Sequence, residues 1–511
     1  MFRIVLTALL LTAGSAATSQ DIRLETSQGT LLGATAGPDN GIRTYKGIPY
    51  AEPPTGERRW KAPMAAAGWS SERLATEFGP DCMQSPYAEN GFYYRPARVT
   101  SEDCLYLNVW SPAARGANLP VMVWIHGGAL TRGSGAINTY DGTNLARKGV
   151  VVVTVNYRLG VFGYFAHPQL QAESEQGSTG NYGILDQVQA LRWVRDHIAA
   201  FGGDPDNVTI FGESAGSWSV NFLTASPLAN GLFHKAIGES GGRLDVRQTL
   251  DQATATGAAL AAEISAPSLP ELRAMPAREL LQAAEAAGYG TDGIVDGWVV
   301  PDQPYAIFAA GEQNKVPVLL GFNKEEGTTL GALAGVPENH DIYVSQIQET
   351  HNDLAGEFLA VYPPGDLRQS TLDAFRDGVF GWEMVTWASM TANVDENAYL
   401  YFFTHQPPGP QREEIGAYHA AEIAYAFNNV HTLRARPTAA DGRLADIMSD
   451  YWVSFARTGI PRVPGQPEWP AWESGSKPYM LFNGTAEPAT DLLPANWEIQ
   501  EKIMARRRSS Q

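Results

Sequence analysis

The chain has 511 residues, of which 44% are hydrophobic, and its formal net charge at pH 7 is −18. This length and apolar content allow a large core, either in one α/β unit or in several domains. The negative charge repels phosphate backbones, and we find no basic stripe beyond Arg506, Arg507 and Arg508, so nucleic acid is not expected as a partner.

The first 20 residues have the composition of an export signal. Arg3 precedes the apolar run 4–11, and small residues follow at 12–17. This order predicts a signal peptide that is cleaved near residues 17–20, with an apolar first strand or helix as the alternative. The protein is therefore expected to be exported, to the periplasm or the medium. No later segment reaches the roughly 18 uninterrupted apolar residues of a membrane span, so no integral membrane segment is expected.

Cys82 and Cys104 are the two cysteines of the chain. Export would place them in an oxidising compartment, which favours a disulfide between them over two buried free thiols. Closing this loop would contribute about 3 kcal/mol in the chain-entropy model. Two cysteines this far apart do not make a zinc site, and neither His-Glu-x-x-His nor Cys-x-x-Cys occurs, so no metal or cofactor is expected.

Short apolar runs recur along the chain, with helical patterns between them. Several are continuous rather than alternating, as expected of strands that are covered on both faces. The runs lie at 121–125, 150–155, 208–211, 236–238, 316–320, 399–403 and 479–482. Between the second and third runs, an apolar stripe at helical spacing extends from Leu185 to Phe201, where Gly-Gly-Asp-Pro ends it. This βαβ unit predicts an α/β fold with a mostly parallel central sheet.

Other segments are predicted to be helical. The spacing of apolar residues from Leu444 to Phe455 predicts a helix whose apolar face packs on the sheet. Residues 245–290 and 330–395 are Ala-rich without obvious strands, and we expect them to be helical insertions that cover one end of the sheet. Since there is no internal repeat or long linker, residues 21–511 are predicted to form a single domain.

The sequence Gly-Glu-Ser-Ala-Gly at 212–216 follows the strand expected at 208–211 and precedes a helical stretch. This is the strand-turn-helix setting of a nucleophile elbow, so Ser214 is the candidate nucleophile. Small neighbours are required there because Cβ atoms would collide with the adjacent strand and helix. Residues 238–242 repeat the Gly-x-Ser-x-Gly pattern around Ser240. Ser214 is favoured because a helical sequence follows it, but the pattern alone leaves both serines open.

An oxyanion loop is predicted upstream, at the end of the strand 121–125. Residues 124–129 are Trp-Ile-His-Gly-Gly-Ala, and small residues let main-chain N–H groups turn toward one point. We expect the amides of Gly128, Ala129 and Ala215 to stabilise the negative oxygen of a tetrahedral intermediate. A simple tight turn is the alternative.

A serine hydroxyl needs a base to take its proton, and the base needs an acid to orient it. Among the histidines after Ser214, we favour His419 as the base because its neighbours are small and it lies on a loop between a strand and an apolar stretch. Glu326 is the candidate acid, since a carboxylate after the strand 316–320 can project over the sheet edge. Adjacent Glu325 remains an alternative, and a solvated turn is the other interpretation of either residue.

Seven motifs in this order resemble the type-B carboxylesterases, including bacterial para-nitrobenzyl esterases and, more distantly, cholinesterases. They are residues 47–54 (Gly-Ile-Pro-Tyr-Ala-Glu-Pro-Pro), 101–108 (Ser-Glu-Asp-Cys-Leu-Tyr-Leu-Asn), 124–129, 201–205 (Phe-Gly-Gly-Asp-Pro), 212–216, 323–327 (Asn-Lys-Glu-Glu-Gly) and His419. The resemblance extends from about residue 24 to 482. It implies the α/β-hydrolase fold and the hydrolysis of small carboxylic esters through an acyl-enzyme, without a cofactor.

Matched position by position, the resemblance implies a triad and an oxyanion hole. The nucleophile, acid and base would be Ser214, Glu326 and His419, and the hole would be formed by Gly128, Ala129 and Ala215. Many members of the family have a third glycine where this chain has Ala129. The amide survives that change, so the hole is expected to survive too.

The resemblance also assigns supporting roles. Ser240 matches a second serine that supports the triad, which resolves the choice between the two serines, and Glu422 matches an acid in the same supporting layer. Glu213, next to the nucleophile, is expected to act with them. Cys82 and Cys104 match the family's first disulfide, whose loop overhangs the active-site gorge.

One departure bears on the substrate. Cholinesterases place a tryptophan within the disulfide loop to stack on choline, and residues 83–103 contain none. The side chains predicted to line the substrate site are instead Tyr87, Phe92 and Tyr93 from this loop, with Leu130 and Trp218 near the catalytic loops. They favour short-chain acyl esters of bulky or aromatic alcohols, with a lipase or an ester-toxin or aromatic-ester hydrolase as alternatives. Non-catalytic family members lack the serine, so Ser214 argues against a binding protein.

Overall fold

The computed structural model describes residues 22–112, 116–246 and 248–509. The signal peptide expected at residues 1–20 lies outside these ranges. The strands are β1 (Ile22–Thr26), β2 (Gly29–Ala36), β3 (Ile42–Pro49), β4 (Arg73–Leu74), β5 (Asp81–Cys82), β6 (Thr100–Ser101), β7 (Tyr106–Ser111), β8 (Leu119–Ile125), β9 (Val151–Val155), β10 (Gly203–Glu213), β11 (Lys235–Glu239), β12 (Val318–Asn323), β13 (Ala398–Phe403), β14 (Tyr479–Phe482) and β15 (Ala486–Ala489).

The helices lie between and after these strands. They are α1 (Thr143–Arg147), α2 (Gly160–Tyr164), α3 (Pro168–Glu173), α4 (Tyr182–His197), α5 (Ala215–Ala225), α6 (Leu250–Glu263), α7 (Leu269–Ala274), α8 (Ala277–Ala286), α9 (Pro304–Ala309), α10 (His340–His351), α11 (Ala355–Val361), α12 (Leu367–Arg376), α13 (Trp382–Ala392), α14 (Arg412–Ile415), α15 (Ile423–Ala426), α16 (Ala439–Thr458) and α17 (Pro494–Ser509). Within the described ranges, none of them is both long and apolar enough to cross a bilayer.

One large sheet organises the chain. Its strand order is β1-β2-β3-β7-β9-β8-β10-β11-β12-β13-β14-β15, with β4 beside β2. The central neighbours from β9 through β14 are parallel. Antiparallel pairing is confined to the two ends, where β1, β2, β3, β7 and β15 lie. The predicted α/β fold with a mostly parallel sheet is therefore confirmed, and its seven predicted strands correspond to β8 through β14.

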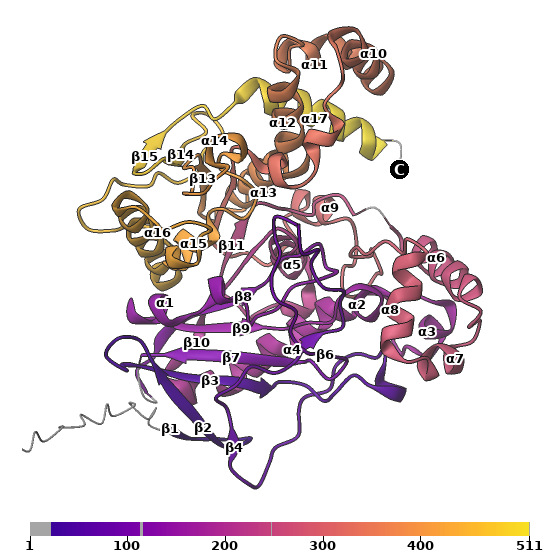
Figure 1. Cartoon of the computed structure of the whole chain (residues 1–511), viewed down its shortest axis with the longest axis vertical. Coiled ribbons are helices and arrows are strands. Elements are labelled where there is room, and N and C mark those ends of the chain that lie inside the picture. The colour runs from indigo at the N-terminus through magenta and orange to yellow at the C-terminus, as the bar shows by residue number, and fades with distance from the viewer. Residues whose placement is uncertain (1–21, 113–115, 247, 510–511) are drawn as a thin grey trace, which may run out of the picture.

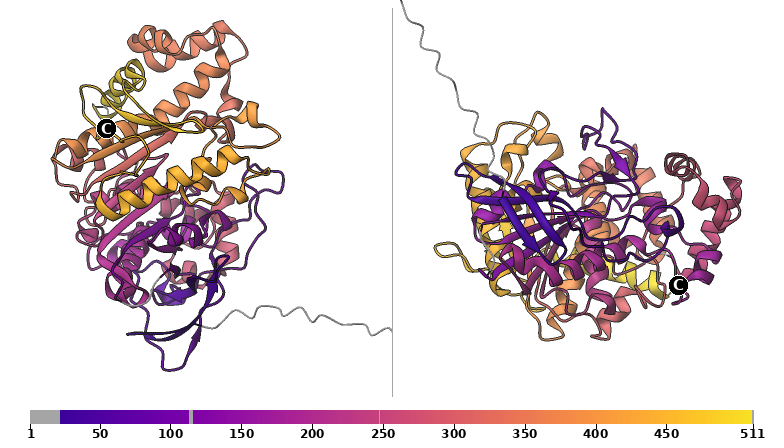
Figure 2. Two further views of the ribbon diagram at one scale, coloured as in Figure 1. Left: turned by 90° about the vertical axis from the view of Figure 1, so that its left-hand side faces the viewer. Right: turned by 90° about the horizontal axis from the view of Figure 1, so that it is seen from below.

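Alternation along β8 divides the core into two layers, because successive side chains of a strand point to opposite faces. Val121 and Val123 pack in the core cluster that includes residues of α4 and α5. Met122 and Trp124 pack in the cluster that includes residues of α1, α15 and α16. Figure 2 shows the gold helix α16 lying across one face of the sheet. The apolar stripe on the helix expected at 444–455 packs on the sheet, as predicted.

The ranges 245–290 and 330–395 consist mainly of helices in the structure. The first contains α6, α7 and α8, and Figure 1 shows these three together on one flank of the molecule, beside α3. The second contains α10 through α13. Buried side chains of α11 and α17, including Phe358 and Ile503, form a small separate cluster there. The C-terminal helix thus packs against the second helical range.

Candidate active site

Ser214 lies on the turn between β10 and α5. Its φ of 56° and ψ of −124° place a non-glycine residue in a sparsely populated backbone region, as at a nucleophile elbow. The turn is crowded, because a Cβ on Gly216 would lie 2.1 Å from the carbonyl oxygen of Ile125. Glycine at 216 therefore permits the close approach of α5 to β8. Ser214 itself lies at the carboxyl end of β10 and is partly exposed.

Ser240 lies on a similar turn after the neighbouring strand β11, with φ of 53°. Its environment differs from that of Ser214, because Ser240 is fully buried and its Oγ donates a hydrogen bond to Glu422 Oε1 at 3.1 Å. No helix follows it directly. The hydroxyl proton of Ser240 is thus already donated to a buried carboxylate of the protein.

The base and acid candidates are in contact. His419 Nδ1 lies 2.6 Å from Glu326 Oε2, and both residues are buried. Glu326 begins the 3-10 helix Glu326–Thr329 directly after β12, and its Oε1 accepts the amide of Asn323 at 2.8 Å. The competing Glu325 accepts the amide of Ala417 at 2.8 Å instead and so fixes the loop before His419.

The other imidazole nitrogen faces a second carboxylate. His419 Nε2 lies 3.0 Å from Glu213 Oε1. Among the described residues, no hydrogen bond joins His419 to Ser214. The ring of Phe380 stacks on the imidazole with a centroid distance of 4.9 Å. Phe380 lies in the π-helical turn Asp377–Gly381, a local widening that is frequent at functional sites.

The charges around His419 shift its titration. Burial lowers the pKa of His419, but the charges of Glu213 and Glu326, together with the hydrogen bond to Glu326, raise it to about 9. Burial raises the pKa of Glu213 to about 8, and the nearby charge of His419 opposes this shift. The two groups therefore titrate as a coupled pair from neutral to alkaline pH.

Further buried carboxylates lie beneath this pair. Glu422 accepts from Ser240 and from the side-chain amide of Asn323. Burial, followed by the charge of Glu326, raises the pKa of Glu422 to about 7. Glu239 accepts from Trp452 Nε1 at 2.7 Å, and burial raises its pKa well above the usual range. Each of these two buried carboxylates is thus held by hydrogen-bond donors.

The oxyanion-loop candidates also have unusual backbone angles. Gly128 has a φ of 109°, and a Cβ there would lie 2.1 Å from the carbonyl oxygen of Arg132. Ala129 has a φ of 55° without being glycine. Within residues 22–112, 116–246 and 248–509, the amides of Gly128, Ala129 and Ala215 donate no hydrogen bond to another group. Donors left open beside Ser214 suit a developing negative oxygen.

Leu130 and Trp218 are two of the five residues expected to line the substrate site. Leu130 is fully buried in the main core. Trp218 lies one helical turn after Ser214, and its amide donates to the carbonyl oxygen of Ser214 at 2.9 Å. The guanidinium of Arg243 lies 4.6 Å from the centre of the Trp218 ring. Trp218 is partly buried and packs against the main core.

The other three belong to the loop between the cysteines. Tyr87 lies beneath the guanidinium of Arg132 at 5.4 Å. Phe92 packs edge-on against Tyr418 with a centroid distance of 4.9 Å. Tyr93 makes hydrogen bonds to the segments of both the base and the acid candidates. All three side chains therefore make contacts within the protein.

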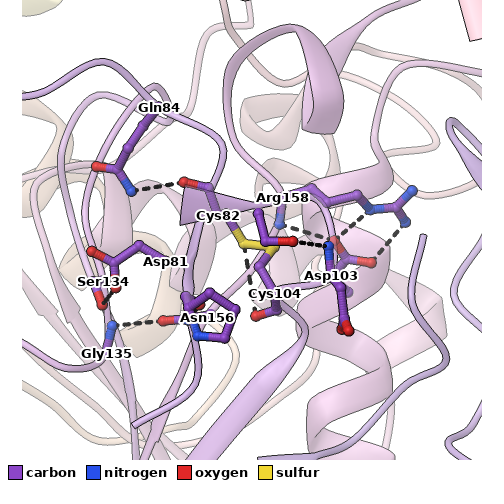
Figure 3. Close-up of a disulfide and its surroundings, with 12 residues drawn as sticks. Asp81, Cys82, Gln84, Asp103, Cys104, Ser134, Gly135, Asn156 and Arg158 are labelled. Carbon is purple, nitrogen blue, oxygen red and sulfur yellow. Dashed lines mark hydrogen bonds and ion pairs between the residues drawn. A yellow bond between two sulfur atoms is a disulfide. The ribbon is translucent and has the colours of Figure 1, made fainter. Parts of the chain in front are cut away.

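The predicted bridge between Cys82 and Cys104 is confirmed, with an S–S distance of 2.05 Å (Figure 3). Gln84, just inside the loop, donates to the carbonyl oxygens of Cys82 at 3.1 Å and of Gly133 at 2.8 Å. Asp81 accepts the hydroxyl of Ser134 at 2.7 Å. The disulfide end of the loop is thus tied to the segment that follows the oxyanion-loop candidates.

Sequence reasoning missed several residues that contact the candidate site. Phe380 stacks on His419, and Arg243 stacks on Trp218, but neither lies in a motif. His126 belongs to the quoted motif without having been assigned a role. It stacks on Tyr157, and burial lowers its pKa to about 4, so it is neutral. Its position next to two glycines was the one signal that could have marked it as a support of the oxyanion loop.

Comparison with known proteins identifies the family. The model of the Carboxylesterase family matches residues 20–497. The fumonisin B1 esterase of Sphingopyxis macrogoltabida is 37% identical over 465 residues, covering 87% of this chain and 84% of that protein. The para-nitrobenzyl esterase of Bacillus subtilis (strain 168) is 35% identical over 474 residues, covering 90% and 94%.

Solved structures of carboxylesterases are also similar to this chain. The crystal structure of the Geobacillus stearothermophilus carboxylesterase EST55 at pH 6.2 superimposes with a TM-score of 0.81 at 35% identity, covering 94% of this chain and 99% of that one. The resemblance drawn from the seven motifs is thereby confirmed over nearly the whole chain. A parallel sheet with this similarity to solved esterases is an α/β-hydrolase fold, and the chain belongs to the carboxylesterase family of carboxylic ester hydrolases.

Proposed function

We propose that Ser214, His419 and Glu326 carry out ester hydrolysis through an acyl-enzyme. The observation that carries the proposal is the contact of 2.6 Å between His419 Nδ1 and Glu326 Oε2, with Ser214 presented on the neighbouring strained turn. A carboxylate at Nδ1 fixes the imidazole in the tautomer whose Nε2 can accept a proton.

The steps follow from this arrangement. Ser214 Oγ attacks the ester carbonyl while His419 Nε2 takes its proton, and the amides of Gly128, Ala129 and Ala215 hold the oxyanion. His419 then protonates the leaving alcohol, and water repeats the sequence to release the acid. Because Nε2 lies 3.0 Å from Glu213 Oε1, a small displacement of the imidazole or of Glu213 must precede attack. Such catalytic contacts often tighten only when substrate binds.

We expect kcat/KM to rise with pH. His419 must be neutral to accept the proton, and its pKa is raised to about 9 by the two carboxylates, so the rise extends into alkaline pH. Removing one of these charges with Glu213→Gln should move the midpoint to lower pH. The measurement is kcat/KM for p-nitrophenyl acetate from about pH 5 to 10.

The control for this experiment is Glu357→Gln, an exposed glutamate paired with Lys502 far from His419 in the sequence. Its profile should coincide with that of the unmodified protein. A flat profile between about pH 5 and 8, or an unchanged midpoint in Glu213→Gln, would contradict the role assigned to His419.

We propose short-chain acyl esters of aromatic or bulky alcohols as the preferred substrates. The bulk of Trp218 supports a narrow acyl site, since Trp218 follows Ser214 by one helical turn and its indole packs closely against Gly241. One relative is named for its action on para-nitrobenzyl esters, which have an aromatic alcohol. Hydrolysis of an ester toxin is the second candidate, because another relative is named a fumonisin B1 esterase.

A panel of esters tests this preference. We expect kcat/KM for p-nitrophenyl acetate and butyrate to exceed the values for octanoate and palmitate, and also the value for butyrylcholine. Trp218→Ala should widen the site and raise the relative rate of the octanoate ester. A maximum at palmitate would favour a lipase, and a maximum at butyrylcholine would favour a choline ester site; either result contradicts the proposal.

We also propose that the protein is exported and that residues 21–511 act as one catalytic domain. The disulfide supports export, because disulfides persist in oxidising compartments. The shared sheet supports one domain, since β1 and β15 are strands of the same sheet. The mass of the protein recovered outside the cytoplasm tests export, with loss of about 17 to 20 residues as the expected result.

A further inference from the structure

The loop between Cys82 and Cys104 makes hydrogen bonds to the segments of the proposed base and acid, and to the segment that follows the oxyanion-loop candidates. At one end, Gln84 exchanges hydrogen bonds with Gly133, donating at 2.8 Å and accepting at 2.9 Å. In its middle, Tyr93 reaches the segments of the base and the acid. The disulfide joins the two ends of the loop (Figure 3).

Tyr93 joins the base to the acid through one oxygen atom. Its hydroxyl donates to the backbone carbonyl of His419 at 2.9 Å. The same oxygen lies 2.7 Å from Thr329 Oγ1, which is free to donate to it. Thr329 ends the 3-10 helix that Glu326 begins. The phenol therefore holds the backbone of the base and the far end of the acid's helix at a fixed separation.

The neighbouring residue fixes this part of the loop on the protein. The ring of Phe92 packs against Tyr418, immediately before His419. The guanidinium of Arg434 lies 3.8 Å from the ring centre of Phe92 and also donates to its carbonyl oxygen. Tyr93 thus presents its hydroxyl from a segment that is held in place by packing.

We propose that Tyr93 is a positioning residue for the His419–Glu326 pair. This role acts through the hydroxyl, because both of its hydrogen bonds are made to the protein, to Thr329 and to His419. His419 sits on a loop and must place Nε2 toward Ser214, and displacements on the order of 1 Å at such a group cost about 10²-fold in rate. This inference rests on the proposed roles of His419 and Glu326.

The test is Tyr93→Phe, which removes one oxygen and keeps the ring. We expect kcat to fall about tenfold with KM nearly unchanged, because the base is misplaced while the substrate contacts remain. The matched control is Tyr343→Phe. Tyr343 is a buried tyrosine of α10 whose hydroxyl also donates to a backbone carbonyl, that of Tyr362 at 2.9 Å. The two variants lose the same kind of bond, so Tm should fall comparably while only Tyr93→Phe loses kcat.

A second comparison asks whether the loop acts through this hydroxyl. Removing the disulfide with Cys82→Ser and Cys104→Ser should also lower kcat. Adding Tyr93→Phe to that background should then lower kcat by much less than tenfold, since coupled residues give non-additive effects. Full additivity would show that the disulfide does not work through Tyr93.

The outcomes separate this inference from the proposed function. Labelling by an organophosphorus serine probe reports the reactivity of Ser214 directly. If the unmodified protein is not labelled, the proposed triad itself is contradicted. With labelling present, equal labelling rates in Tyr93→Phe and the unmodified protein would overturn the positioning role. A raised KM with unchanged kcat in Tyr93→Phe would also overturn the positioning role, and would indicate that Tyr93 contacts the substrate.

Discussion

Replacing Ser214 with alanine is expected to lower kcat by about 10⁴- to 10⁶-fold while leaving the protein folded, because the attacking oxygen is gone and the support around it remains. The elbow itself should persist, since the crowding at Gly216 and the positive φ at 214 are properties of the backbone that alanine, like serine, must adopt. Single-turnover and steady-state rates with p-nitrophenyl acetate give the measurement, and far-ultraviolet circular dichroism checks the fold.

Ser240→Ala is the matched control, because it removes the same atom from the second Gly-x-Ser-x-Gly turn. Ser240 Oγ donates to Glu422, so its loss should lower kcat only about tenfold to a hundredfold. The organophosphorus probe should label Ser240→Ala and fail to label Ser214→Ala. Equal losses of activity in the two variants would mean that the nucleophile has been assigned to the wrong turn.

The central sheet could be predicted because its strands are buried on both faces and therefore form continuous apolar runs. The edge strands could not. In β1, half-buried and exposed positions alternate over five residues, and β3 includes Arg43 and Lys46, so neither gives an apolar run. Both strands pair antiparallel, and β3 pairs with a strand far along the chain, β7.

In the candidate site, too, some features could be predicted from the sequence and others could not. The turn of Ser214 and the loop of Gly128 need small residues at fixed spacing, so they leave a mark in the sequence. The choice between Glu325 and Glu326 does not, because it depends on which carboxylate the 3-10 helix turns toward His419. The stacking of Phe380 on His419 arises where a π-helical turn meets a distant loop, and no local pattern encodes that meeting.

The roles of the residues expected to line the substrate site cannot be read from composition. The aromatic side chains of the disulfide loop are predicted from the sequence to line the substrate site, and Tyr93 and Phe92 also make specific contacts with the His419 loop. An aromatic residue near a site can face the substrate or hold the site together. Sequence does not distinguish these roles, since both use the same residue types, whereas the partners of the Tyr93 hydroxyl do.

The second large effect is expected for Glu326→Gln. The amide keeps the size of the side chain, but an NH₂ group can turn toward His419 Nδ1, which favours the tautomer that carries its proton on Nε2. That tautomer cannot accept the proton of Ser214, so kcat should fall about 10³- to 10⁴-fold with KM little changed. Losing the carboxylate charge should also lower the pKa of His419, since that charge is among the causes that raise it.

Glu325→Gln is the control that the chain itself provides, one residue away. Glu325 accepts the amide of Ala417 through an oxygen that glutamine retains, so the loop should stay in place and kcat should stay within about threefold of the unmodified value. Steady-state kinetics for both variants, measured across pH, decide between the two carboxylates. A larger loss in Glu325→Gln than in Glu326→Gln would transfer the role of the acid to Glu325, and the 2.6 Å contact between His419 and Glu326 would then have no part in catalysis.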